Sequence, residues 1–346
     1  MEIAQVTRGP EQTTIAQPAL FYRITALWAL CEAFLGGVLH ALHLPGTGLF
    51  VGGASVVCIS LLYYYGPSRA AILKATILVI LVKGMLSPHT PPGAYLAVLI
   101  QGALGYLFFR SRAHYKISCV VLGVITQLQS ALQRLVVMLV LFGADLYQVA
   151  HGFVNYILKK AGMPEGEYVL YVVLVYIGAH ALMGVFVGWL AGRLPGILTK
   201  RQLYFRQQLA NAEVNTISIV DNQLPARRKR KPLVSGVLLA IAGLLAGALY
   251  LNITPDQQVL AIVVRALLIY IVWTQLVMPL LGKFLQQWTS RKRSVLAEEI
   301  TQLLSVLPFV KQQVRLAWAA LPEKPLYRKL LLFLPLCLAA VMQQPD

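Results

Sequence analysis

Long apolar segments recur along this chain, and they constrain its fold more than any other feature. Most are about 20 residues long, the length of helix that crosses a hydrocarbon layer of roughly 30 Å. None alternates in the ten-residue pattern of an outer-membrane barrel strand. Because backbone groups in lipid must be paired within their own segment, we expect an all-α, polytopic integral membrane helical bundle. The predicted spans are 20–42, 46–65, 69–86, 92–110, 117–142, 168–190, 233–251 and 259–281, with a short apolar piece at 330–342.

The amino-acid composition indicates the same class of protein. Of the 346 residues, 58% are hydrophobic and only 12% are charged, which is too apolar for an ordinary soluble domain of this size. The four cysteines lie inside apolar segments instead of at the spaced loop positions of a disulfide framework. The first 19 residues lack the pattern of a cleaved signal peptide, so the first apolar segment is expected to remain as a span.

The distribution of Lys and Arg between the loops predicts the orientation. The basic loops are "YGPSR", "RSRAHYK" and 193–231, whereas "HLPGTG", "SPHTPPG" and "NITPDQQ" contain no Lys or Arg. The connection 143–167 is an exception, since Lys159 and Lys160 lie on the positive-poor side. By the positive-inside rule we expect a plasma (inner) membrane protein with a cytoplasmic N-terminus and six spans before the basic stretch.

The net charge of +17 does not by itself indicate a nucleic-acid partner. The run "ARRKRKP" at 226–232 follows a predicted span, where basic residues set topology and contact anionic lipid. The sequence also contains no P-loop, no zinc-protease histidine motif and no glycine-flanked serine. We therefore expect membrane lipid as a partner, no nucleic acid, no catalytic residues and no cofactor.

Several polar side chains fall inside the predicted spans, where such residues tend to face a cavity. In the fifth span, Gln129 and Gln133 share one helical face. Two interpretations are open: a wet internal site, or hydrogen bonds that hold helices together. The full set is Glu32, Lys74, Lys83, Gln101, Gln127, Gln129, Gln133 and Arg134.

Three histidines, His40, His43 and His89, lie beside proline and glycine in two loops that the charge pattern places on the outer face. Such loops suit a lid over a cavity, and the imidazoles could hydrogen-bond a polar ligand or bind a divalent metal. No further ligand follows at a fixed spacing, so no metal site is predicted. Solvated loop histidines are the alternative.

The C-terminal third adds a different set of elements. The basic stretch 193–232 is expected to be a cytoplasmic linker, followed by two spans and an amphipathic cytoplasmic helix that ends near Pro322. The apolar stripe of the C-terminal helix comprises Ile300, Leu303, Leu304, Leu307, Val310 and Val314.

The connection after the fifth span is also predicted to form an amphipathic helix, with Leu146, Val149, Phe153 and Ile157 on one side.

Residues 20–192 resemble the substrate-binding S component of energy-coupling-factor (ECF) transporters. The resemblance rests on six spans, outer loops at the first and third turns, the small-residue stripe of the first span, and the segment "HTPPGAYLAVLIQGALGYLFF". It implies that Ala29, Ala33 and Gly37 contact a transmembrane T component, although packing within the same bundle would use the same stripe. The implied substrate-binding residues are His40, His43, Thr47, His89, Gln101, Gln127 and Arg134.

The C-terminal region resembles an ECF T component only weakly, because the arginine-glycine endings of its coupling helices are missing. The expected organisation is a substrate-binding module at 1–192, a linker at 193–232 and a helical coupling module at 233–346. The expected function is capture of a vitamin-like micronutrient from the outside, with a separate T component and ATPase subunits as partners. The alternative is a non-transporting scaffold whose C-terminal helices bind a cytoplasmic partner. A lipid transferase is disfavoured because no acidic pair for magnesium lies on a cytoplasmic loop.

Overall fold

In the computed structural model, the described residues are 11–35, 46–87, 92–143, 146–216, 295–321 and 326–343, with five isolated positions between these ranges. These residues form ten α-helices, and no strand occurs among them. The prediction of an all-α chain is therefore confirmed for this part of the protein. The predicted spans 233–251 and 259–281 lie outside the described residues, apart from single positions in the second.

The helices over the predicted spans 46–65, 69–86, 92–110 and 117–142 match those bounds within two residues. The helix over 20–42 begins earlier, at Glu11, and the helix over 168–190 continues to Lys200. A π-helix, Cys31–Leu35, prolongs the first helix, and a short 3₁₀ turn, Arg112–His114, precedes α6. The α-helices are α1 (Glu11–Leu30), α3 (Thr47–Tyr65), α4 (Ala70–Leu86), α5 (Pro92–Phe108), α6 (Tyr115–Phe142), α7 (Leu146–Lys160), α8 (Val169–Lys200), α9 (Gln202–Thr216), α13 (Val295–Ala319) and α14 (Leu326–Met342).

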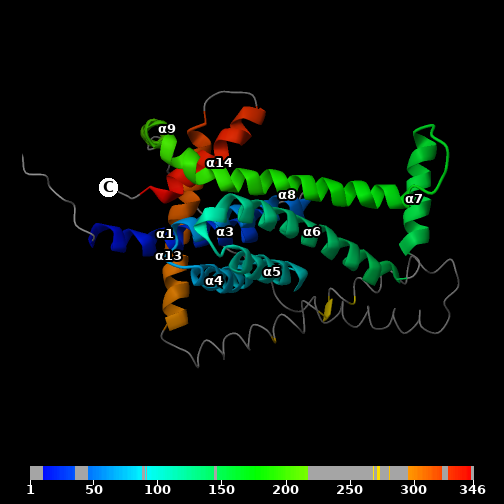
Figure 1. Ribbon diagram of the computed structural model, residues 1–346, viewed down its shortest axis with the longest axis horizontal. Helices are drawn as coiled ribbons and strands as arrows, with labels where there is room; N and C mark the ends of the chain where they lie inside the picture. Colours follow the sequence, from blue (N-terminus) through cyan, green and yellow to red (C-terminus); the bar gives the residue numbers. More distant parts are fainter. Residues whose placement is uncertain are drawn as a thin grey trace, which may run out of the picture.

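Figure 1 shows that α1, α3, α4, α5, α6 and α8 run roughly along one common direction. Helix α7 stands across this direction at one end, and α13 crosses the bundle near the other. Helix α1 packs against α3, α4 and α13, while α6 packs along α8. This arrangement places a layer of apolar helices between two helices that lie crosswise.

Three helical stretches are long and apolar enough to cross a membrane: Thr47–Tyr65, Arg112–Val140 and Val169–Lys200. Two shorter apolar helices, Gly93–Phe108 and Leu332–Met342, accompany them. Many large apolar side chains on α6 and α8 point outward, including Leu139 and Val175, which are more than half exposed. An outward apolar surface on long helices is the pattern that contact with lipid tails requires.

Glycines allow α6 and α8 to approach closely. A Cβ added at Gly184 would lie 2.6 Å from the Cα of Val124, and one added at Gly188 would lie 2.4 Å from the carbonyl oxygen of Cys119. No side chain fits at these distances, so backbone packs directly on backbone. Small residues at spacing four are the usual means by which helices in lipid pack this closely.

The stretch 193–232, which the sequence predicted to be a basic linker, begins with helical residues. Helix α8 continues through Pro195 to Lys200, and α9 then covers 202–216. The polar residues of this stretch lie on exposed faces, while Phe205 and Leu209 of α9 are almost fully buried. Helix α9 packs against α13 and α14, and this burial makes helix favourable where composition alone suggested a linker.

The C-terminal helices pack onto the N-terminal bundle. Helix α13 is continuous from Val295 to Ala319 and ends near the predicted position. Its apolar stripe faces inward, with Leu303 and Val310 fully buried in the hydrophobic core. Helix α14 contacts α1, α8 and α9.

Candidate functional site

An ion pair lies inside the helical bundle between Glu32 and Lys83. The Nζ atom of Lys83 lies 2.6 Å from Oε2 of Glu32, and the two side chains are only 4% and 3% exposed. Glu32 lies in the π-helix that follows α1, and Lys83 lies in the last turn of α4. Removing two charges from water costs several kcal/mol per ion, which such a pair recovers only with further hydrogen bonds.

Ser55 and Trp28 supply those further hydrogen bonds. The Ser55 hydroxyl lies 2.7 Å from Oε1 of Glu32, and the Trp28 indole N–H donates to the Ser55 oxygen at 3.0 Å. Trp28 is fully buried at this position. The four residues form one continuous polar network between α1, α3 and α4.

A tyrosine on α5 borders the same network. The Nζ atom of Lys83 lies 5.9 Å from the centre of the Tyr95 ring, within the range of a cation–π contact. The Tyr95 hydroxyl in turn approaches the Ser87 carbonyl oxygen at 3.4 Å. Four helices therefore contribute to the surroundings of one buried ion pair.

A second polar group lies against the first half of α3. The Gln127 amide of α6 donates to the Leu49 carbonyl oxygen at 2.9 Å. A Cβ added at Gly52 would lie 3.7 Å from the same amide nitrogen. The first half of α3 thus contacts both Gln127 and, through Ser55, the Glu32 network.

Four buried side-chain oxygens near the middle of α5 and α6 have no hydrogen-bond partner in the described structure. Buried polar atoms are normally satisfied, so an unsatisfied group marks a place where water or a ligand binds, or a strained one. The atoms are Oε1 of Gln101, Oγ1 of Thr126, Oε1 of Gln127 and Oε1 of Gln129. These oxygens all accept hydrogen bonds, and they favour a ligand rich in N–H or O–H donors.

The ion pair and the unpaired oxygens lie on neighbouring helices of one apolar bundle, since α4 packs on α5 and α3 packs on α6. The pair carries one group of each charge, and the oxygens add neutral acceptors. Such groups are chemically complementary to a zwitterionic or hydrogen-bonding solute. Three His, Cys, Asp or Glu side chains do not come together as a metal site anywhere in the described residues.

The predicted substrate-binding residues fall into three groups. Thr47, Gln101 and Gln127 are buried inside the bundle, whereas Arg134 is exposed on α6. His40, His43 and His89 lie outside the described residues. Their binding roles stay predictions, since only the positions of the first four residues are described.

The predicted partner-binding stripe lies largely within the chain's own core. Ala29 is fully buried and Ala33 is partly buried, while Gly37 lies outside the described residues. Helix α1 packs against α13 of the same chain. Contact between this stripe and a separate subunit stays a prediction.

Two features of the site were missed in the sequence. Ser55 looked like one of many small residues in an apolar span, and nothing local distinguishes it. The close contact of α6 with α8 did have a signal, because Gly184, Gly188 and Gly192 follow at spacing four in "GVFVGWLAG".

Comparison with protein-family models, with curated proteins and with solved structures finds no match to this chain.

Proposed function

We propose that this protein is a membrane transport component that captures a small, polar, vitamin-like micronutrient within its helical bundle. In this proposal the solute enters from the outer face, and a separate complex of T component and ATPase subunits drives its release. The chain is embedded in the plasma (inner) membrane through its apolar helices, with a cytoplasmic N-terminus.

The buried Glu32–Lys83 pair is the observation that carries this proposal. Ionisable residues inside apolar helical bundles are costly, and they commonly mark the path or binding site of a solute. A purely structural role would be served at least as well by apolar residues of similar volume. The hydrogen bonds from Ser55 to Glu32 and from Trp28 to Ser55 hold the pair in one geometry.

The unsatisfied oxygens on α5 and α6 support the same proposal. They provide hydrogen-bond acceptors on helices that pack against those of the ion pair, and a polar solute with N–H or O–H donors would satisfy them. The competing scaffold hypothesis requires a free apolar face on the C-terminal helices. On α13 that face is already covered, since Leu303 and Val310 are fully buried within this chain.

Native mass spectrometry of the full chain, purified in mild detergent, tests the proposal. We expect the wild-type protein to carry a small-molecule adduct that is absent from the double variant Glu32→Met/Lys83→Met. This variant removes both charges together, so it is expected to fold. The matched control is Glu299→Gln, which removes a second Glu–Lys pair whose lysine side chain is 48% exposed.

Two outcomes would contradict the proposal. One is an identical adduct in the wild type and in the double variant, which would place the ligand elsewhere. The other is a wild type that carries no adduct and whose thermal unfolding temperature is unchanged by a panel of water-soluble vitamins.

A further inference from the structure

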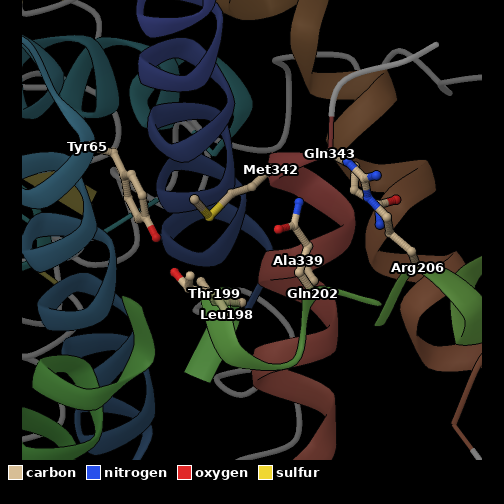
Figure 2. A pocket seen from close by; sticks show the side chains of 8 residues that line it. All are labelled: Tyr65, Leu198, Thr199, Gln202, Arg206, Ala339, Met342 and Gln343. Carbon is tan, nitrogen blue, oxygen red and sulfur yellow. The ribbon is translucent and has the colours of Figure 1, made fainter. Parts of the chain in front are cut away.

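A cavity of about 390 Å³ lies between the ends of α3, α8, α9 and α14, as shown in Figure 2. This volume is within the usual range for a small-ligand site. Tyr65, the last residue of α3, lines it, and lies ten residues beyond Ser55 on the same helix. At 1.5 Å per residue, roughly 15 Å of helix separates the cavity from the Glu32 network.

The described residues around this cavity contribute positive charge. Among the described residues that line the cavity, Arg206 is the one that carries a charge, and it forms no ion pair with another described residue. A second guanidinium, that of Arg23, donates a hydrogen bond to the backbone oxygen of Gln343 at the rim. The cavity therefore favours an anion over a cation.

The polar lining supplies hydrogen-bond donors around Arg206. Figure 2 shows Arg206 and Gln343 together on one side of the cavity and the hydroxyls of Tyr65 and Thr199 on the other. Within the described residues, the Tyr65 hydroxyl and the side-chain amides of Gln202 and Gln343 form no hydrogen bond, whereas the Thr199 hydroxyl already donates to the Pro195 carbonyl oxygen. A guanidinium combined with neutral N–H and O–H donors matches the oxygens of a phosphate group.

The remaining lining is apolar and belongs to membrane-length or apolar helices. Leu198 comes from α8, and Ala339 and Met342 come from α14. The cavity lies where apolar α3 ends and where α8 changes from apolar residues to Lys200. This is the level at which headgroups meet acyl chains, so a ligand here can place its phosphate on Arg206 and its tails along α8 and α14.

We propose that this cavity binds the phosphate headgroup of an anionic phospholipid, with Arg206 as the principal contact. Basic pockets between helices on the cytoplasmic side are suited to such headgroups. The inference rests on the chain being embedded in a membrane in the proposed orientation, and it does not depend on the proposed transport activity.

Native mass spectrometry of the full chain with added phosphatidylglycerol tests this site. We expect the wild type to retain phosphatidylglycerol in preference to phosphatidylcholine. The variant Arg206→Ala should weaken retention about fivefold, the loss expected from one basic residue near an anionic lipid. Arg201→Ala is the matched control, because Arg201 is exposed nearby but does not line the cavity.

The same titration includes soluble glycerol phosphate, which carries the phosphate without acyl chains. Tight binding of glycerol phosphate that displaces the lipid would assign the cavity to a soluble phosphate ligand and overturn the proposal. Equal retention by the wild type and Arg206→Ala, or equal loss in Arg201→Ala, would also overturn it. Since Arg206 is exposed, all variants should unfold at the wild-type temperature, and a thermal scan checks this.

Discussion

The carboxylate of Glu32 and the ammonium of Lys83 meet at 2.6 Å inside the bundle, although 51 positions separate them in the chain. The contact joins the π-helix that prolongs α1 to the last turn of α4. It is the most buried ion pair among the described residues, since the others involve Lys74 and His151, whose side chains are 48% and 34% exposed. Its energetics can be tested independently of any ligand.

The single variant Glu32→Gln should strongly destabilise the protein. It leaves the Lys83 ammonium buried without a counter-charge, which typically costs about 3–5 kcal/mol. Thermal unfolding in detergent measures the effect. The control Glu299→Gln should cost less, because its partner Lys74 is 48% exposed and stays hydrated when the carboxylate is lost.

The double variant Glu32→Met/Lys83→Met tests whether the protein needs the two buried charges for its stability. With both ions replaced by apolar side chains of similar volume, stability should return to near or above the wild-type value. If Glu32→Gln alone unfolds at the wild-type temperature, the buried pair is not holding α1 to α4 and this account of it is wrong.

Ser55→Ala should also lower the free energy of unfolding. It deprives the Trp28 indole N–H of its acceptor and Glu32 of a donor, and an unsatisfied buried donor costs about 1–3 kcal/mol. Ser60→Ala is a control on the same helix, where the hydroxyl donates to the carbonyl oxygen of Val56 and contacts the Cys119 thiol but no charged group. Chemical denaturation of both variants should show the larger loss for Ser55→Ala, and equal losses would contradict the network.

Adding a methyl group at the crossing of α6 and α8 should destabilise the bundle. In Gly188→Ala the new Cβ would lie 2.4 Å from the Cys119 carbonyl oxygen, so the helices must separate. Overpacking of this kind costs about 1–3 kcal/mol.

A glycine elsewhere on α8 provides the control for that variant. A Cβ at Gly178 meets nothing within 4 Å, and Gly→Ala there should stabilise the helix by up to about 1 kcal/mol. Thermal unfolding of the two variants should therefore shift in opposite directions. A shift of the same sign and size would show that α6 and α8 do not pack closely at Gly188.

Helix α7 should lie in the membrane interface with one face in lipid. Phe153 is 63% exposed and belongs to the predicted apolar stripe, while Figure 1 shows α7 standing across the direction of α6 and α8. The measurement is tryptophan fluorescence in vesicles whose lipids carry brominated acyl chains. Phe153→Trp should add fluorescence that the bromine atoms quench. Gln148→Trp, on the opposite face, should add a signal that bromine leaves largely unchanged. Equal quenching at the two positions would contradict this orientation.

Apolar run length was sufficient to predict where most helices lie. The prediction 46–65 corresponds to α3, 69–86 to α4 and 117–142 to α6, because helix is the state that pairs the backbone of an apolar segment internally. The period of the apolar residues likewise predicted α7 and α13. Helix α9 was missed because its burial against α13 and α14 is not visible in its own composition.

Site geometry depended on contacts between segments distant in the chain. Glu32 and Lys83 were each recognised as polar residues inside spans, yet their pairing required α1 and α4 to pack side by side. Ser55 acquired its role only through its distances to Glu32 and Trp28.

The sequence by itself therefore determined the helical class, the positions of the apolar helices and the presence of buried polar groups. These follow from local hydrophobicity and backbone hydrogen bonding. Only the tertiary structure decided which polar groups meet and which residues, such as Arg206 and Tyr65, border the same cavity. The physical reason is that helix packing brings together residues far apart in the chain, and their separation in sequence does not predict their distance in space.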